Sequence, residues 1–136
     1  MRVLIVLLLL AFASVAQASQ EGILPFSSFR LESVGIGSSG KVVVEGRQDE
    51  GSHLVSLKVE AFGKTFEVPK EKLAGLAELL SNGVRITYEA GYTELGGRTV
   101  YIELQMGFTS GTGKRAIVSI TESGAIEVSA IEINNA

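Results

Sequence analysis

The sequence has no cysteine and no tryptophan, and its 136 residues include only two prolines and one histidine. Without cysteine the chain has no disulfide, no thiolate ligand for zinc and no cysteine nucleophile. The formal net charge is -3, which argues against nucleic acid or an anionic membrane as a partner. The composition therefore favours one small domain that is stabilised by an apolar core rather than by cross-links.

The first residues have the pattern of an export signal. Arg2 precedes an apolar run over residues 3–13, and Ala16-Gln17-Ala18 supplies the small-x-small motif of a cleavage site. The run is shorter than the roughly 20 residues that a membrane span needs. We therefore expect residues 1–18 to be a signal peptide that is cleaved after Ala18. The mature protein would be one β-rich domain over residues 19–136, periplasmic or secreted, with no membrane span.

Glycine is abundant, with 16 residues, and the glycines separate segments in which apolar and polar residues alternate. From residue 84 onward this period of two predicts four strands and a four-stranded antiparallel meander over residues 84–130, with one apolar face. Its last turn, Glu122-Ser123-Gly124, fits a three-residue hairpin with a left-handed glycine. Further strands are expected around residues 29–31, 41–45 and 55–61, and Phe62-Gly63 fits a two-residue hairpin.

Aligning the apolar faces of neighbouring strands gives a register for the meander. That register pairs Tyr88 with Ile102, Leu104 with Val118, and Ile120 with Ile126. After Ala130 the alternation changes phase, which predicts a β-bulge or the end of the strand.

One helix is predicted over residues 70–82. Leu73, Leu76, Ala77 and Leu80 have the spacing of one helical face, and Gly83 stands where a left-handed C-terminal cap belongs. The predicted fold class is α+β, mainly antiparallel β with about seven or eight strands. The helix, about residues 70–82, would pack on the apolar face of the C-terminal meander.

Three apparent motifs are better explained as turns. The glycines of residues 35–40 match G-x-G-x-x-G, but a predicted strand follows them instead of the helix that a dinucleotide site requires. Ser38 and Lys41 have the S-x-x-K spacing of penicillin-binding enzymes, without the S-D-N and K-T-G partners. His53 and Asp49 share one loop and offer too few ligands for a metal ion. We therefore expect no metal site, no cofactor and no enzymatic activity.

The segment from Tyr88 to Tyr101 contains all three tyrosines, and tyrosine and arginine are typical of recognition surfaces. In the predicted register Tyr101 lies beside Glu89 on the polar sheet face, Arg98 faces Tyr92 at the hairpin mouth, and Tyr88 points into the core. The candidate binding residues are Tyr92, Glu94, Arg98, Tyr101, Glu89 and Glu103. The two acids on the sheet face, Glu89 and Glu103, lack the cleft of a glycosidase and are expected to pair with Arg85 and Arg115.

Two hypotheses for the function remain open. The first is an exported, non-catalytic binding module, such as an inhibitor or immunity-type protein, that acts on a protein partner. The alternative is a structural or accessory component of the cell envelope that assembles through β-edges or a homodimeric sheet. A carrier for a small apolar ligand would further require a cavity between the helix and the sheet.

Overall fold

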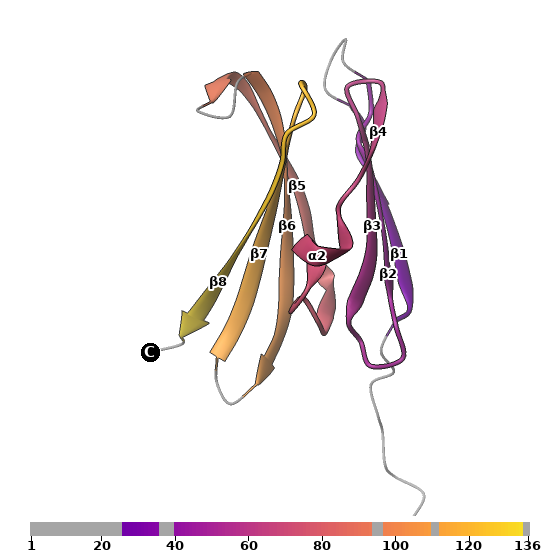
Figure 1. Cartoon of the computed structure of the whole chain (residues 1–136), viewed down its shortest axis with the longest axis vertical. Coiled ribbons are helices and arrows are strands. Elements are labelled where there is room, and N and C mark those ends of the chain that lie inside the picture. The colour runs from indigo at the N-terminus through magenta and orange to yellow at the C-terminus, as the bar shows by residue number, and fades with distance from the viewer. Residues whose placement is uncertain (1–25, 36–39, 94–96, 110–111, 135–136) are drawn as a thin grey trace, which may run out of the picture.

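The computed structural model describes residues 26–35, 40–93, 97–109 and 112–134 and shows two four-stranded antiparallel sheets (Figure 1). The first sheet comprises β1 (Ser28–Glu32), β2 (Val43–Gln48), β3 (Leu54–Ala61) and β4 (Lys64–Glu67). The second comprises β5 (Leu79–Thr93), β6 (Gly97–Thr109), β7 (Thr112–Thr121) and β8 (Ile126–Asn134). Both sheets are meanders in chain order, so the predicted C-terminal meander is confirmed. The predicted signal peptide lies outside the described residues.

The apolar faces of the two sheets pack against each other and form one core. Val44, Val59, Val100, Ile102 and Leu104 are fully buried in this core. Each sheet alternates apolar and polar side chains, so each must cover one face. Figure 1 shows that the first sheet, and not a helix, lies opposite the second. The arrangement is a small β-sandwich.

The predicted helix over residues 70–82 is wrong beyond its first turn. The helix α2 spans only Lys70–Leu73, and the chain leaves the helical conformation at Ala74. Gly75 is left-handed, with φ +82°, so the glycine that ends the helix is Gly75 and not Gly83. Gly83 lies in β5, where an added Cβ would be 2.8 Å from the Cβ of Gln105.

Pairing with other elements explains why the helix stops. The backbone carbonyl of Leu76 accepts a hydrogen bond from the amide of Leu54, and the amide of Glu78 donates to the carbonyl of Ser52. The carbonyl of Glu78 accepts a bond from the amide of Gly107. The segment between α2 and β5 therefore bonds to both sheets, and these tertiary bonds override the helical propensity of its sequence.

The predicted register of the meander is wrong by two residues between β6 and β7 and, from Val84 to Glu89, between β5 and β6. The pair Thr93 and Gly97 at the end of the β5–β6 hairpin lies in the predicted register. Ile86, not Tyr88, lies opposite Ile102, and Ile102, not Leu104, lies opposite Val118. Ile120 does pair with Ile126, as predicted. A slip of two residues keeps every side chain on its face, so matching the faces could not detect it.

The strand β8 differs from the prediction at its C-terminal end. It pairs with β7 from Ile126 to Asn134 without a register shift, so there is no bulge after Ala130. The change of phase in the sequence places Ile131 on the outer face, where it is 45% exposed.

Two predicted turns are confirmed. Phe62 and Gly63 join β3 to β4 with φ of 54° and 71°, as a two-residue type I′ hairpin requires. Gly124 has φ +101° in the turn between β7 and β8. No helix among the described residues is long and apolar enough to cross a membrane.

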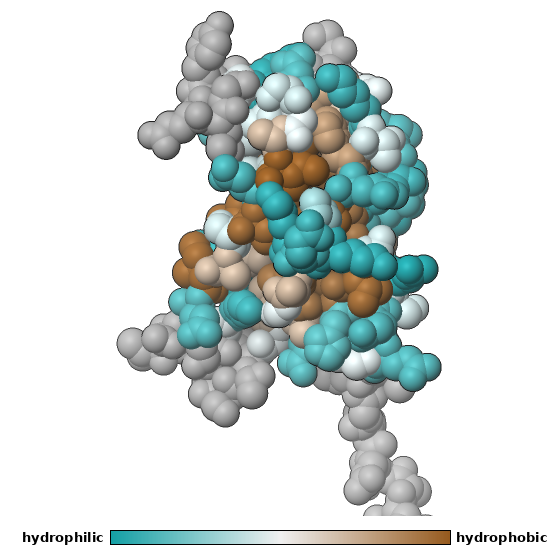
Figure 2. All heavy atoms as spheres, viewed as in Figure 1, coloured by the Kyte–Doolittle hydropathy of each residue, from teal (hydrophilic) through white to brown (hydrophobic). Residues whose placement is uncertain are grey.

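The side of the sandwich on which α2 lies is incompletely covered by polar groups. Figure 2 shows apolar residues gathered in the middle of this side, with polar residues around them. Phe66, Ile126 and Val128 pack against the core and remain partly exposed. Apolar side chains at the edges of the two sheets are therefore more exposed to solvent than those in the core between the sheets.

Candidate functional site

The outer face of the second sheet, which we call the β5–β8 face, carries a row of fixed polar side chains. This row consists of Arg85, Glu89, Tyr101, Glu103 and Arg115. They project from β5, β6 and β7 on the side away from the core, because they alternate with the buried residues of those strands. Three of the predicted binding residues, Glu89, Tyr101 and Glu103, are therefore brought together.

Glu103 lies at the centre of this row, between two arginines. Arg85 Nη2 is 2.9 Å from Glu103 Oε2, and Arg115 Nη1 is 3.4 Å from Glu103 Oε1. The Glu103 side chain is 14% exposed, whereas Arg85 is 69% exposed. Partial desolvation raises the pKa of Glu103, but Arg85 and then Arg115 outweigh it, so the pKa lies below its usual value. The predicted pairing of this acid with both arginines is confirmed.

Tyr101 and Glu89 form the second contact of the row. The hydroxyl of Tyr101 donates a hydrogen bond to Glu89 Oε2 at 2.9 Å. This bond, together with desolvation, raises the pKa of Tyr101. Glu89 therefore binds tyrosine and not an arginine, contrary to the expectation for this acid. The bond holds the half-buried tyrosine ring in one orientation on the exposed sheet surface.

Arg98, another of the predicted binding residues, lies outside this row. Its guanidinium forms an ion pair with Glu122 through two hydrogen bonds and lies over the ring of Phe62, 5.6 Å from the centroid. The pairing with Glu122 raises the pKa of Arg98, and Tyr88 contributes in the same direction. Arg98 thus joins the end of the second sheet to the β3–β4 hairpin. Its placement opposite Tyr92 stays a prediction, because the side chain of Tyr92 lies outside the described residues.

The other residues singled out from the sequence do not belong to this row of polar side chains. Glu94 lies outside the described residues, and for Tyr92 only the backbone in β5 is described. Tyr88 is on the inner side of β5 by register but is 37% exposed, so it is less of a core residue than predicted. His53 Nδ1 is 3.3 Å from Asp49 Oδ1 in an exposed loop. No group of three or more His, Asp or Glu side chains in the described ranges is arranged to hold a metal ion.

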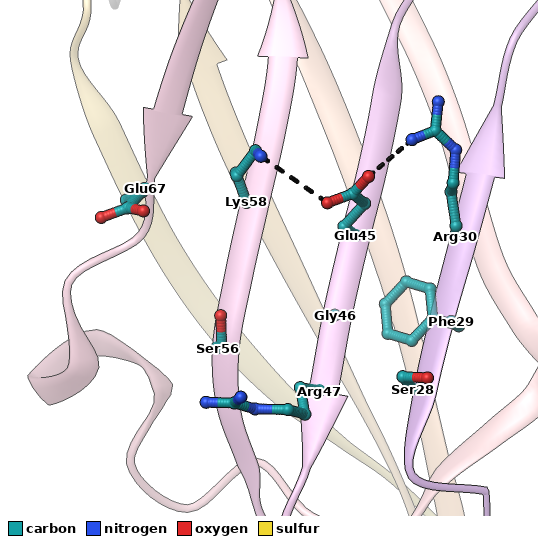
Figure 3. Close-up of a pocket in the computed structure, with 9 residues that line it drawn as sticks. All are labelled: Ser28, Phe29, Arg30, Glu45, Gly46, Arg47, Ser56, Lys58 and Glu67. Carbon is teal, nitrogen blue, oxygen red and sulfur yellow. Dashed lines mark hydrogen bonds and ion pairs between the residues drawn. The ribbon is translucent and has the colours of Figure 1, made fainter.

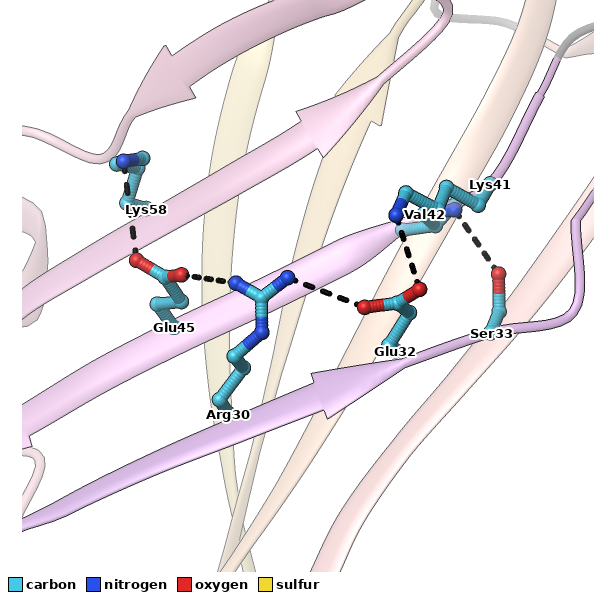
Figure 4. Close-up of polar contacts among 7 residues, drawn as sticks. All are labelled: Arg30, Glu32, Ser33, Lys41, Val42, Glu45 and Lys58. Carbon is cyan, nitrogen blue, oxygen red and sulfur yellow. Dashed lines mark hydrogen bonds and ion pairs between the residues drawn. The ribbon is translucent and has the colours of Figure 1, made fainter.

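The sequence analysis did not predict a second polar surface, on the outer face of the first sheet. Figure 4 shows a chain of alternating charges across β1, β2 and β3. It runs through Lys41, Glu32, Arg30, Glu45 and Lys58. Arg30 is exposed, and its bonds to Glu32 and Glu45 raise its pKa. The same alternation that predicted these strands places the charged residues on one face, so this ladder could have been found from the sequence.

A depression of about 450 Å³ lies beside this ladder (Figure 3). Ser28, Arg47 and Ser56 line one end, in a row across three paired strands. Gly46 is part of the floor, and a Cβ there would be 2.1 Å from the ring of Phe29, so a larger residue would require the Phe29 ring to move. The cations Arg30 and Lys58 at the other end are already paired with Glu45, which leaves less charge for a ligand.

Comparisons with known proteins place the chain in no family, since no family model, no curated protein and no solved structure matches it significantly.

Proposed function

We propose that this chain is a small exported binding module that recognises a protein partner through the β5–β8 face. The observation that carries the proposal is the set of partly or fully exposed side chains that their neighbours already hold in place. Tyr101 is held by Glu89, and Arg85 and Arg115 are held by Glu103. A partner would therefore lose little side-chain entropy on these residues when it binds.

The chemistry of the face suits another protein. Tyrosine and arginine are the residues that dominate binding energy in protein interfaces. Ile117 lies between Glu103 and Ser129 in the register and adds a half-buried apolar side chain to the same face. A sheet face with an aromatic ring, an aliphatic side chain and fixed charges resembles the mixed composition of such interfaces.

The charges favour binding over acid–base catalysis. A general acid at neutral pH needs a carboxyl group whose pKa is raised, as in an apolar pocket. The pKa of Glu103 is lowered by its two arginines, so this carboxylate stays ionised. We therefore propose a non-catalytic role. Export rests on the signal-like pattern of residues 1–18, and a periplasmic or secreted location is part of the same proposal.

Affinity capture from an extract of the source organism's envelope and medium tests this function. Three columns would carry the wild-type protein, Tyr101→Ala and the control Lys58→Ala, which changes the outer face of the other sheet. A partner of the β5–β8 face is retained by the wild type and by Lys58→Ala and is lost with Tyr101→Ala. Retention by all three columns would contradict the proposal.

A further inference from the structure

The edge strand β8 lacks several of the features that usually protect sheet edges. In the described part of the chain β8 is the last strand of the second sheet and pairs only with β7. Its sequence from Ile126 to Asn134 has no proline, lysine or arginine, and its pairing has no register shift. At the opposite edge of this sheet, β5 has two register shifts. Lysines, prolines and bulges normally prevent edge pairing, and the charged residues of β8 are two glutamates, Glu127 and Glu132, so β8 is an edge open to pairing.

The backbone groups that face this edge can be assigned. The amide of Thr121 donates a hydrogen bond to the carbonyl of Ala125 at 3.0 Å, in the same register as the pair Ile120 and Ile126. Hydrogen-bonded pairs alternate with non-hydrogen-bonded pairs in an antiparallel ladder. Odd-numbered residues of β8 therefore bond to β7, and even-numbered residues direct their amides and carbonyls outward.

A contact from α2 agrees with this assignment. Lys72 Nζ donates a hydrogen bond to the carbonyl of Ile126 at 2.6 Å, from outside the sheet. Ile126 is even-numbered, and its outward carbonyl is thereby satisfied. The open part of the edge consequently begins at Val128. Within that part, Ile131 is 45% exposed, and it is the one large exposed apolar residue of β8 whose side chain is described.

We propose that β8 pairs antiparallel with β8 of a second copy of this chain, with the two-fold axis at Ile131. This register places Ala130 opposite Glu132 of the second copy, and these even-numbered residues would exchange backbone hydrogen bonds. The two Ile131 residues face each other at a non-hydrogen-bonded position, where Cα atoms are about 4.5 Å apart. An exposed apolar side chain thereby becomes covered by its own copy.

The proposed register also avoids unfavourable contacts. Pairing starts at Val128, so the bond between Lys72 and Ile126 stays intact. A two-fold axis at Ala130 would instead need the carbonyl of Ile126. No two glutamates lie directly opposite each other, since Glu132 faces Ala130. The strand is thus its own complement, which favours a second copy over an unrelated extended segment, and isologous pairing is the commonest symmetry of oligomers.

One strand pair is a small interface, so we expect a reversible monomer–dimer equilibrium. The chain has a net negative charge, and repulsion between copies should weaken pairing at low ionic strength. The dimer fraction should therefore rise with protein and salt concentration. This inference does not rest on the proposed partner, since it follows from the backbone edge of β8 and not from the polar row. Ile131 nevertheless lies on the same face as the row, opposite Arg115.

Two proline variants test the proposal by sedimentation velocity over a range of protein concentrations. Ala130→Pro removes an amide that points to the open edge and leaves the bonds to β7 intact, so this variant should stay monomeric with a nearly unchanged Tm. Ser129→Pro removes an amide that bonds to β7, so it should lower the Tm. Ile131→Lys, which adds a charge to the edge, should also stay monomeric.

The wild-type protein should dimerise in the same experiment, and its Val128, Ala130 and Glu132 amides should exchange more slowly as the concentration rises. A wild-type protein that is monomeric at every concentration would overturn the proposal, including the case in which β8 serves a different partner. A dimer that persists in both Ala130→Pro and Ile131→Lys would also overturn it. If Ala130→Pro fails to fold, Ile131→Lys decides.

Discussion

Arg98 lies over the ring of Phe62, with its guanidinium carbon 5.6 Å from the ring centroid, and so connects the two sheets at one end of the sandwich. The guanidinium is at the same time paired with Glu122, which follows β7. Phe62 is held in a left-handed conformation by the tight turn between β3 and β4. The arginine that the sequence suggested as a recognition residue is thus part of the packing between sheets.

We predict that Arg98→Ala and Phe62→Ala each lower the Tm, because each removes one side of this contact. The Tm decrease of the double variant should be smaller than the sum of the two single decreases, since the contact is lost only once. Thermal unfolding followed by circular dichroism measures all four proteins. Strictly additive decreases would show that the two side chains do not interact.

One substitution at Gly75 distinguishes the observed turn from the predicted helix, because the two structures predict opposite changes in the free energy of unfolding. In a helix, Gly75→Ala would stabilise the protein by about 1 kcal/mol. In the structure Gly75 has φ +82°, and a non-glycine residue in the left-handed region costs roughly 1–2 kcal/mol. We predict that Gly75→Ala lowers the free energy of unfolding, measured by urea denaturation. A more stable variant would contradict the turn.

Leu76 and Leu80 provide a second test of this segment. Leu76 is 2% exposed and belongs to the core, whereas Leu80 is only half-buried at the start of β5. Leu76→Ala should therefore cost about 2–5 kcal/mol of unfolding free energy, and Leu80→Ala clearly less. The predicted helix would have buried both leucines on one face, and equal losses would support that helix.

The sequence predicted the strands well because each strand shows its own alternation. It could not predict the two-residue differences in register, since both registers align the apolar faces. It also placed Leu73, Leu76 and Leu80 on a helical face, although the leucines of this segment that the fold buries are Leu73, Leu76 and Leu79. What decides between these patterns is the set of bonds from residues 76–78 to both sheets, and such distant pairing leaves no local signal.

The candidate site was predictable to the same extent. Glu89, Tyr101 and Glu103 share one face by alternation alone, and the structure confirms that they do. The partner of Arg98 could not be predicted, because Glu122 is 24 residues away and reaches Arg98 only after β6 and β7 have paired. The face of a side chain thus follows from local spacing, and its partner follows from tertiary structure.

The stability of the protein should depend on the protonation of Glu103. Its pKa in the folded state lies below the value of about 4.3 expected in the unfolded chain. The stabilisation is therefore fully present above that unfolded value and is lost as the pH falls through the folded-state pKa. We predict that Glu103→Gln is less stable than the wild type near pH 7. The difference should shrink at acidic pH, as urea titrations at several pH values would show.

The pKa of Tyr101 gives a spectroscopic test of its bond to Glu89. The carboxylate of Glu89 raises this pKa, so Tyr101 should ionise at lower pH in Glu89→Gln than in the wild type. Ultraviolet absorbance of tyrosinate follows the titration, and Tyr101→Phe identifies its contribution among the three tyrosines. An identical titration in the wild type and in Glu89→Gln would show that the hydrogen bond is absent in solution.

The central claim is that the β5–β8 face binds the partner, and calorimetric titration of the captured partner tests it most directly. We predict that Tyr101→Ala weakens the affinity by at least about tenfold, on the scale of an interface hot spot. Lys58→Ala, on the other sheet, should bind within about twofold of the wild type, as expected for a surface change outside the interface. Both variants should keep their Tm close to that of the wild type. Equal affinity of Tyr101→Ala and the wild type would contradict the account.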